Sequence, residues 1–509
     1  MGSARACASL HSEEFHSCLV FIQQGYNSME AFTIKSSSSS AKVSATQRGI
    51  DGWSMDSSKP TTGIRTTTTT PSRLCRAQHE DQSYYLQTAQ LLGMKLSTVL
   101  ALAGLAMSSL TAGKPKVPLH TSSRWILGSD NQRVKLRCVN WAGHLEANVP
   151  EGLHKQPVAA IAGWIAAHGF NCVRLTYSID MALHPDLPVA QSFRAAAVAT
   201  GADEAGLMAL HDAAVCTNPF LHNATVLEAF DAVQAALWDY GIMTILDNHV
   251  SRASWCCNLD DGNGWWSDAP GDVDANSRFF DHGRWLDGLR AMAAWARGKP
   301  GIIGMSLRNE LRAHVTQIPA AAGVWRENMP AAAKAVHGAN PDVLVIMGGL
   351  NGGTDLTPLR DRSRDTSAWA GKNVWEAHAY SFTITTPDFG SCSIRKVNYG
   401  LLFGFVLEQN KGNTGPLFLS EFGVGMTGGD KDGLNDKDSS YLTCLREYME
   451  DNDADWSLWA LQGTYYVRDG KVDAEETWGA LDHDWKDWRN PKFKAMLGKM
   501  PEVTQFPRG

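Results

Sequence analysis

Short apolar runs alternate with amphipathic segments along the chain from residue 134 onward. The runs have the length of buried strands, and the segments between them repeat apolar residues at every third or fourth position, as helices do. Strands are predicted over residues 134–141, 170–177, 242–249, 301–310, 343–348, 373–380, 415–423 and 455–461. Helices are predicted over residues 157–168, 226–240, 285–296, 320–337, 401–409, 440–449 and 485–500.

Strands that alternate with helices in this way predict an α/β fold. If all of the strands are parallel and joined by right-handed crossovers, they form a (β/α)8 TIM barrel. Residues 134–461 exceed the roughly 250 residues typical of that fold, so long rim loops are expected. The segment 178–221 is too long for a plain connection and is predicted to be a functional insertion. No repeat or low-complexity linker divides residues 114–509, which are predicted to be a single domain.

The first 113 residues differ from the rest of the chain. Residues 1–93 contain a serine run at 36–40 and a threonine run at 66–70, a composition typical of disorder. Residues 94–113 begin with Met94 and Lys95, continue with an apolar run and end in small residues, which is the form of a secretory signal peptide. We expect Met94 to be the true start, residues 1–93 to be a gene-model extension, and the protein to be secreted and extracellular. An internal membrane anchor with a disordered cytoplasmic tail is the alternative.

Cysteine usage agrees with secretion. Cys216 is a candidate partner of Cys256 or Cys257, and Cys392 of Cys444, although spacing alone does not decide connectivity. Residue parity places Cys172 inside the barrel, where we expect a buried thiol. The spacing of Cys and His residues does not match structural zinc. Residues 223–225, Asn-Ala-Thr, are a glycan acceptor sequence.

Composition narrows the class of ligand. The 509-residue chain has 44% hydrophobic residues and 18 Trp, enough for a large core. Its formal net charge of −7 and the lack of a basic stripe argue against a nucleic acid or an anionic membrane as partner. Indole faces stack on sugar rings as well as on other side chains, so the Trp content fits a carbohydrate ligand.

Two predicted strands end in a glutamate, Glu310 in one case and Glu421 in the other. In α/β barrels, side chains at the carboxyl ends of the strands line the active site. Two carboxylates that each end a strand therefore indicate a general acid/base and a nucleophile. Further polar and aromatic residues stand at the other strand ends: Arg174, Asn248, His249, Asn309, His378, Tyr380 and Trp459.

This set of residues resembles glycoside hydrolase family 5, the cellulase and mannanase family of retaining enzymes, over residues 134–461. The resemblance implies a secreted, fungal-type member in which Glu310 is the acid/base and Glu421 is the nucleophile. Leu311 follows Glu310, where many members have proline. The motifs that carry the resemblance stand in order at successive strand ends: Asn309-Glu310, His378-Ala379-Tyr380 and Ser420-Glu421-Phe422-Gly423.

The resemblance implies that Arg174 and Tyr380 bond to the Glu421 carboxylate and keep it ionised. Retaining cleavage requires two carboxyl groups about 5–5.5 Å apart. Like charges at that separation push the two pKa values apart, so one carboxyl can stay protonated near neutral pH.

Other residues are implied to contact the sugar. Asn309 would hold the 2-hydroxyl of the sugar being cleaved, and Trp459 would form a stacking floor. His249 and His378 would bond sugar hydroxyls or the acid/base. Loop aromatic residues could either stack on distal sugars or pack within the loops: Trp255, Trp265, Trp266, Tyr465 and Tyr466.

The predicted function is therefore a retaining glycoside hydrolase that acts on β-glycosidic bonds of a polysaccharide or oligosaccharide, first of all an endo-β-1,4-glucanase. β-Mannan, β-1,3-glucan and a glycolipid glycan are alternative substrates. No cofactor and no metal is implied, and a monomer is expected. A metal-dependent hydrolase that uses Asp247, His249 and His378 is disfavoured because the first strand lacks a His-x-His pair. A non-catalytic glycan-binding barrel is disfavoured because both carboxylates are present.

Overall fold

A computed structural model describes residues 114–360, 365–382 and 391–507. The predicted disordered segment 1–93 and the signal-like segment 94–113 lie outside the described residues. A search of the described part of the chain for a helix of sufficient length and apolarity to cross a membrane finds none.

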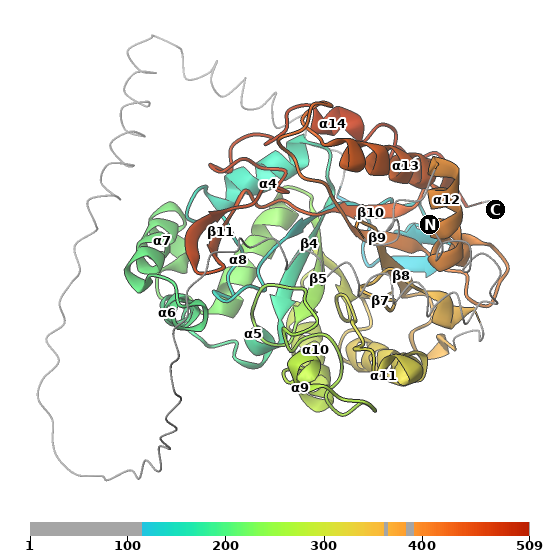
Figure 1. Ribbon diagram of the computed structural model, residues 1–509, viewed down its shortest axis with the longest axis horizontal. Helices are drawn as coiled ribbons and strands as arrows, with labels where there is room; N and C mark the ends of the chain where they lie inside the picture. The colour runs from blue at the N-terminus through green and yellow to red at the C-terminus, as the bar shows by residue number, and fades with distance from the viewer. Residues whose placement is uncertain (1–113, 361–364, 383–390, 508–509) are drawn as a thin grey trace, which may run out of the picture. The chain divides into compact units, whose positions relative to one another are not determined.

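Eight parallel strands close into a barrel at the centre of the described fold (Figure 1). Each strand pairs with its neighbours along the chain, and the last pairs with the first to complete the ring. The fold is therefore the predicted (β/α)8 barrel. The strands are β3 (Arg137–Trp141), β4 (Cys172–Ser178), β5 (Met243–Val250), β6 (Ile302–Ser306), β7 (Leu344–Gly348), β8 (Asn373–His378), β9 (Leu417–Phe422) and β10 (Asp455–Leu458).

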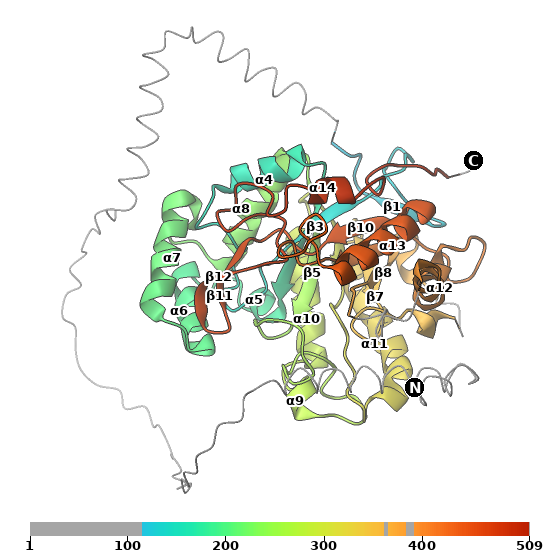
Figure 2. The same ribbon diagram turned by 45° about the horizontal axis from the view of Figure 1, so that its top comes forward.

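Helices surround the barrel (Figures 1 and 2). Their apolar faces pack on the outer faces of the strands in one large buried cluster. Helix α8 begins with a capping box, because Thr225 accepts a hydrogen bond from the Glu228 amide and the Glu228 side chain accepts one from the Thr225 amide. The helices are α4 (Val158–Ala167), α5 (Ile179–Leu183), α6 (Val189–Thr200), α7 (Glu204–Thr217), α8 (Val226–Asp239), α9 (Asp274–Ser277), α10 (His282–Ala296), α11 (Ile318–Ala339), α12 (Cys392–Leu402), α13 (Asp436–Asn452) and α14 (Phe493–Met496).

The barrel interior changes from apolar to polar within one step along the strands. Its amino end is a buried apolar cluster of Cys138, Cys172, Ile245, Val374, Phe418 and their neighbours, to which Leu119 and Ile126 near the hairpin β1 (His120–Ser122) and β2 (Trp125–Leu127) also belong. Side chains two residues apart on a strand share a face. The next interior residues on the same strands are buried and polar: Asn140, Arg174, Asp247, Glu376 and Ser420.

The insertion at residues 178–221 folds into helices α5, α6 and α7. Helices α6 and α7 contact a second hairpin, β11 (Thr464–Arg468) and β12 (Lys471–Glu475), which follows the last barrel strand (Figure 2). The hairpin brings Arg468 and Glu476 to the mouth of the barrel. The insertion therefore supports one wall of the cavity described below.

Two predicted helices are wrong. Residues 401–409 hold the end of α12 and a 3-10 turn, η6 (Gly404–Leu407), because Phe403 and Gly404 interrupt the helical backbone. Residues 485–500 contain only the short α14, since Trp485 has a φ of 58° and the segment around it forms turns. Both hairpins, and the helices of the insertion, were not predicted.

The cysteine predictions are partly corrected. Cys172 is buried as expected, but it is bonded to Cys138, its partner in register on the neighbouring strand, and so it is not a thiol. Cys256 and Cys257 are bonded to each other, which excludes the predicted bridge from Cys216 to either of them. The predicted bridge between Cys392 and Cys444 is confirmed.

Trp285 ties α10 to the barrel directly below the carboxyl end of β6. Its side chain is fully buried, packs against Trp266 and Phe280, and donates a hydrogen bond from Nε1 to the Leu307 carbonyl at 3.0 Å. We predict that Trp285→Ala lowers the free energy of unfolding by about 3–5 kcal/mol, measured by denaturant titration, because a large cavity forms in the core.

Trp285→Phe is the matched control. It keeps a ring in the core but leaves the Leu307 carbonyl without its donor, and we expect a smaller loss of about 1–3 kcal/mol. A loss below 1 kcal/mol for Trp285→Ala would contradict the role given to this side chain.

Candidate active site

A cavity opens at the carboxyl ends of the barrel strands. Six of the eight residues to which the sequence assigns a role in the site line it: His249, Asn309, Glu310, Tyr380, Glu421 and Trp459. The other two, Arg174 and His378, are buried and contact the two glutamates directly. The barrel therefore brings together all eight side chains from β4, β5, β8, β9 and the segments that follow β6, β8 and β10.

Arg174 is the cation of the site, and its side chain is completely buried. The guanidinium donates to Glu421 Oε1 at 2.7 Å and to Asp247 Oδ1 at 2.7 Å, and it donates to Asn309 Oδ1 at 3.0 Å. Burial alone would lower the pKa of Arg174, but the surrounding carboxylates raise it above its ordinary value. One permanently charged group therefore orients the carboxylate of Glu421 and the amide of Asn309.

Glu421 receives a further hydrogen bond from the Tyr380 hydroxyl to Oε2 at 3.0 Å. The two donors contact different oxygens, so the positions of both carboxylate oxygens are fixed. Hydrogen bonds to the charged form favour ionisation of a carboxyl group. The expected contacts of Arg174 and Tyr380 with Glu421 are present.

Glu310 lies opposite Glu421, with His378 between them. His378 Nδ1 is 3.0 Å from Glu310 Oε1 and 3.5 Å from Glu421 Oε2. One oxygen from each carboxylate and the His378 nitrogen all lie within 4.8 Å of one another. Glu310 has a φ of 39°, in the left-handed region that costs about 1–3 kcal/mol for a residue other than glycine. Such local strain is found mainly at functional sites.

Burial shifts the titration of both glutamates. It raises the pKa of Glu310 to about 7, against the opposing effect of Arg312 and Arg174. It also raises the pKa of Glu421 to about 7, against the opposing effect of His378 and Arg174. Of the two, only Glu421 has a guanidinium and a phenol hydrogen-bonded to its carboxylate, and these contacts favour the ionised form of Glu421 over that of Glu310.

Asp247, His249 and Asn309 form a second chain of contacts. His249 Nδ1 donates to Asp247 Oδ2 at 2.6 Å, and burial lowers the pKa of His249 well below its usual value, so the ring is neutral. Its Nε2 atom then accepts from Asn309 Nδ2 at 3.3 Å. Trp459 stacks on His249 with ring centroids 5.3 Å apart. These contacts fix the orientation of the Asn309 amide, which lies at the cavity wall.

Of the five loop aromatic residues named from the sequence, only Trp255 lines the cavity. Trp265, Trp266, Tyr465 and Tyr466 are fully buried, so for these four residues packing within the fold is the role observed. Trp255 stands against the guanidinium of Arg468, 3.6 Å from its ring centroid.

Sequence reasoning missed several residues of the site. Glu376 stands two residues before His378 on a predicted strand, so parity gave a signal that it faces the interior. Asp247, two residues before His249, was considered only as a metal ligand. Other residues lie on loops, where no periodicity marks them: Cys256, Cys257, Phe382, Arg468, Glu476 and Trp478.

The structure disfavours the metal-dependent alternative, because its proposed ligand Asp247 already has other partners. The Asp247 carboxylate is bonded to Arg174 and to His249, which leaves it poorly placed to bind an ion. Among the described residues, two other groups converge closely enough to hold a cation, Glu310 with His378 and Glu421, and Glu310 with Cys256 and Cys257.

Comparisons with known proteins agree with this geometry. The Cellulase model, for glycosyl hydrolase family 5, matches residues 139–464. A glycosyl hydrolase 5 family protein from Chamaecyparis obtusa is 39% identical over 425 residues, covering 82% of this chain and 71% of that protein. An endoglucanase from Paenibacillus polymyxa is 20% identical, and the match covers 78% of this chain and 91% of that protein. The solved complex of an endocellulase from Pyrococcus horikoshii with cellotetraose has a TM-score of 0.57 at 18% identity. This match covers 75% of this chain and 99% of the endocellulase chain.

Removal of the central cation should destabilise the fold in a pH-dependent manner. Arg174→Met leaves the buried carboxyl groups of Glu421 and Asp247 without their counter-charge, and we predict a loss of about 3–5 kcal/mol in unfolding free energy at pH 8. The wild-type pKa values are about 7 for Glu421 and about 6 for Asp247. Below those values both groups are neutral in the folded state of either protein, so the loss should be smaller at pH 5.

Arg174→Lys is the control, because it keeps a charge but its single nitrogen has three N–H donors and cannot replace the planar guanidinium, which donates to four acceptors. We expect its free energy of unfolding at pH 8 to lie between those of wild type and Arg174→Met. Denaturant titrations at pH 5 and pH 8 measure both variants. If the difference in unfolding free energy between wild type and Arg174→Met were equal at the two pH values, the electrostatic role of Arg174 would be contradicted.

Proposed function

The chain belongs to glycosyl hydrolase family 5 and is an O-glycosyl hydrolase, and from this premise we propose that it is a retaining endo-β-1,4-glucanase with Glu310 as acid/base and Glu421 as nucleophile. One observation carries the proposal. The two carboxylates approach within 4.8 Å, yet only Glu421 is bonded to a guanidinium and a tyrosine hydroxyl. That asymmetry suits one protonated acid and one ionised nucleophile at the spacing of retaining enzymes.

In the first step, Glu421 attacks the anomeric carbon while the protonated Glu310 donates its proton to the glycosidic oxygen. The bond to the leaving sugar breaks, and a glycosyl ester forms on Glu421. Arg174 and Tyr380 hold the attacking carboxylate in place without a rearrangement.

In the second step, the ionised Glu310 takes a proton from water, and the water oxygen attacks the anomeric carbon. The ester to Glu421 breaks, so the product keeps the β configuration. The raised pKa of Glu310, about 7, lets it act as acid in one step and base in the next at neutral pH.

The supporting residues are assigned to the sugar between the glutamates. Asn309 presents its amide nitrogen to the cavity and would donate to the 2-hydroxyl, a bond that strengthens in the transition state. Trp459 offers a ring face at the cavity wall for stacking on that sugar.

β-1,4-Glucan is the proposed substrate because relatives carry the names endoglucanase and endocellulase, and one of the latter is solved with cellotetraose. The sequence of residues 94–113 supports a further proposal, that the protein is exported and acts outside the cell.

Reducing-sugar release tests the substrate and the nucleophile together. We predict that the protein releases reducing ends from soluble β-1,4-glucan faster than from β-mannan or β-1,3-glucan. Glu421→Ala should lower the rate by at least about 10⁴-fold, because no other group can form the glycosyl ester. Glu421→Ala should remain folded, as judged by its melting curve. Equal rates for the variant and wild type would refute the assignment.

Wild type that binds these glycans without cleaving them would instead identify a glycan-binding barrel. Preferential cleavage of β-mannan, β-1,3-glucan or a glycolipid glycan would change the substrate but leave the catalytic pair in place.

Leaving groups and pH test Glu310. Glu310→Ala should lose most of its kcat/KM on glucan but keep most of its kcat/KM on aryl β-glycosides with acidic phenols, because kcat/KM reports the first step and these phenols leave without a proton. In wild type, kcat/KM should fall as pH rises above about 7 because Glu310 loses its proton. On an activated aryl glycoside, Glu310→Ala should lack this alkaline decline. An equal loss of activity on both substrate types would exclude Glu310 as the acid.

A further inference from the structure

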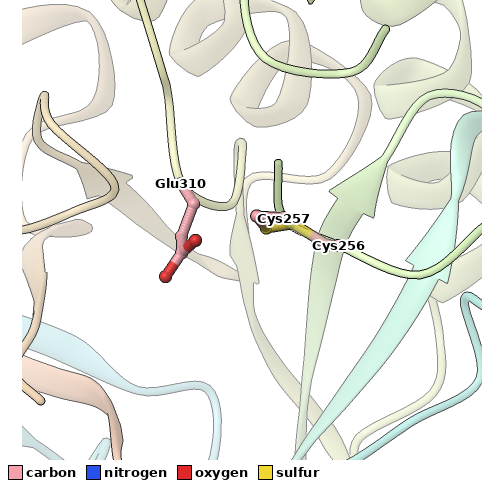
Figure 3. Close-up of side chains that lie close together, drawn as sticks. All are labelled: Cys256, Cys257 and Glu310. Carbon is pink, nitrogen blue, oxygen red and sulfur yellow. A yellow bond between two sulfur atoms is a disulfide. The ribbon is translucent and has the colours of Figure 1, made fainter. Parts of the chain in front are cut away.

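The loop after β5 carries a disulfide between two consecutive residues, Cys256 and Cys257, at the wall of the cavity. Both residues line the cavity beside Asn309 and Glu310. Figure 3 shows the bonded sulfur atoms and the Glu310 side chain next to each other. Both sulfur atoms and a Glu310 carboxylate oxygen lie within 4.8 Å of one another.

The sulfur atoms also face the amide of Asn309. Asn309 Nδ2 is 3.6 Å from Cys256 Sγ and 3.7 Å from Cys257 Sγ, distances suited to a weak sulfur acceptor. This is the nitrogen to which the proposed function assigns the 2-hydroxyl of the reacting sugar. The disulfide therefore borders the space in which that sugar must lie.

The loop is fixed to the catalytic segment from one side by Arg312. Its guanidinium donates to the Glu310 carbonyl at 2.7 Å and to the Asn258 carbonyl at 3.1 Å, and it pairs with Asp261 at 2.8 Å. Its Nη1 atom lies 3.4 Å from Cys256 Sγ.

Arg308 fixes the same loop from below. It is fully buried and donates to the Asn263 carbonyl at 2.5 Å and to Ser251 Oγ at 3.1 Å. The Asn263 side chain in turn accepts from the amides of Ser251 and Arg252. Because Arg308 and Arg312 flank Glu310 in the chain, the disulfide and the acid/base are held as one unit.

We propose that the Cys256–Cys257 disulfide is a substrate-contacting wall of the sugar site, so that its reduction weakens substrate binding. The inference rests on the proposed function. A disulfide is apolar and polarisable, and the C–H faces of a pyranose ring are the apolar part of a sugar. A sugar placed to receive the proton of Glu310 comes within van der Waals reach of sulfur atoms that are already within 4.8 Å of that carboxylate.

The bond also limits where the two sulfur atoms can go. Reduction by a dithiol transfers two electrons and two protons to the pair, which yields two cysteine thiols and a cyclic disulfide of the reductant. Each thiol then rotates independently, and the two side chains of adjacent residues can separate. Cys257 is partly exposed at the cavity, so a soluble reductant has access.

The test compares two paired variants in the full-length protein. Cys256→Ser/Cys257→Ser opens the wall disulfide, whereas Cys392→Ser/Cys444→Ser opens the bond between α12 and α13, which does not line the cavity. We expect the first variant to raise KM on soluble β-1,4-glucan about tenfold, equivalent to about 1.4 kcal/mol, with kcat within about threefold of wild type. The second should lower the melting temperature and leave KM unchanged.

Mild dithiothreitol gives the same contrast without mutation. It should raise the KM of wild type and of Cys392→Ser/Cys444→Ser, but not that of Cys256→Ser/Cys257→Ser. Alkylation of the freed thiols and peptide mass spectrometry identify which bond was reduced. Reduction of wild type by dithiothreitol still tests the proposal if Cys256→Ser/Cys257→Ser fails to fold. A wild-type KM in the first variant, or in wild type with alkylated Cys256 and Cys257, would overturn the proposal.

Binding separates this proposal from the proposed function. Tryptophan fluorescence measures the affinity of each protein for cellotetraose, mannotetraose and laminaritetraose without turnover. A wild type that binds one of them but does not cleave it overturns the proposed function alone. Equal affinity of wild type and Cys256→Ser/Cys257→Ser for that sugar overturns the disulfide wall alone.

Discussion

The active site depends on one buried guanidinium. Arg174 stands on β4, and its side chain donates to acceptors from β3, β5, β9 and the segment after β6. Three carboxylates, those of Asp247, Glu421 and Glu376, lie within 4 Å of it. Without a fixed cation, that much negative charge could not be buried. The barrel therefore organises its polar interior around Arg174, and the Glu421 carboxylate is one of several groups that the same charge holds.

This arrangement explains how two similar glutamates can have different roles. Glu421 is buried and Glu310 is partly exposed at the cavity, and desolvation raises both pKa values to about 7. What differs is the set of neighbours. Glu421 is bonded to Arg174 and Tyr380, while Glu310 has a neutral His378 on one side and, on the other, the cavity that it shares with the disulfide loop. These contacts favour ionisation of Glu421 over ionisation of Glu310, which is what the proposed mechanism requires of a nucleophile and an acid.

The fold and most of the site could be predicted from strand ends. Apolar runs that lead into His249, Glu310 and Glu421 indicated the strands and the polar rim together, because in this fold side chains at or just beyond the carboxyl ends of the strands line the cavity. Asp247 was named only as a ligand of the disfavoured metal-dependent hydrolase, although parity also places it in the barrel interior beside Arg174. The wall formed by Cys256, Cys257 and Trp478 could not be predicted, since loops have no periodicity and their positions are set by tertiary contacts such as that between Arg312 and Asp261. The bond between Cys138 and Cys172 depends on the register of two strands, which spacing in the chain does not give.

The central claim is that Glu421 forms a covalent bond to the sugar, while Glu310 donates a proton in the first step and accepts one in the second. The most direct test is mass spectrometry of the protein after reaction with a 2-deoxy-2-fluoro cellobioside that carries a good leaving group. Fluorine at C2 slows both steps, and the leaving group restores only the first, so the glycosyl ester accumulates. The account predicts one added glycosyl group, located by peptide fragmentation on Glu421. A label on another residue, or turnover of the unmodified substrate with inversion and no label, would contradict it.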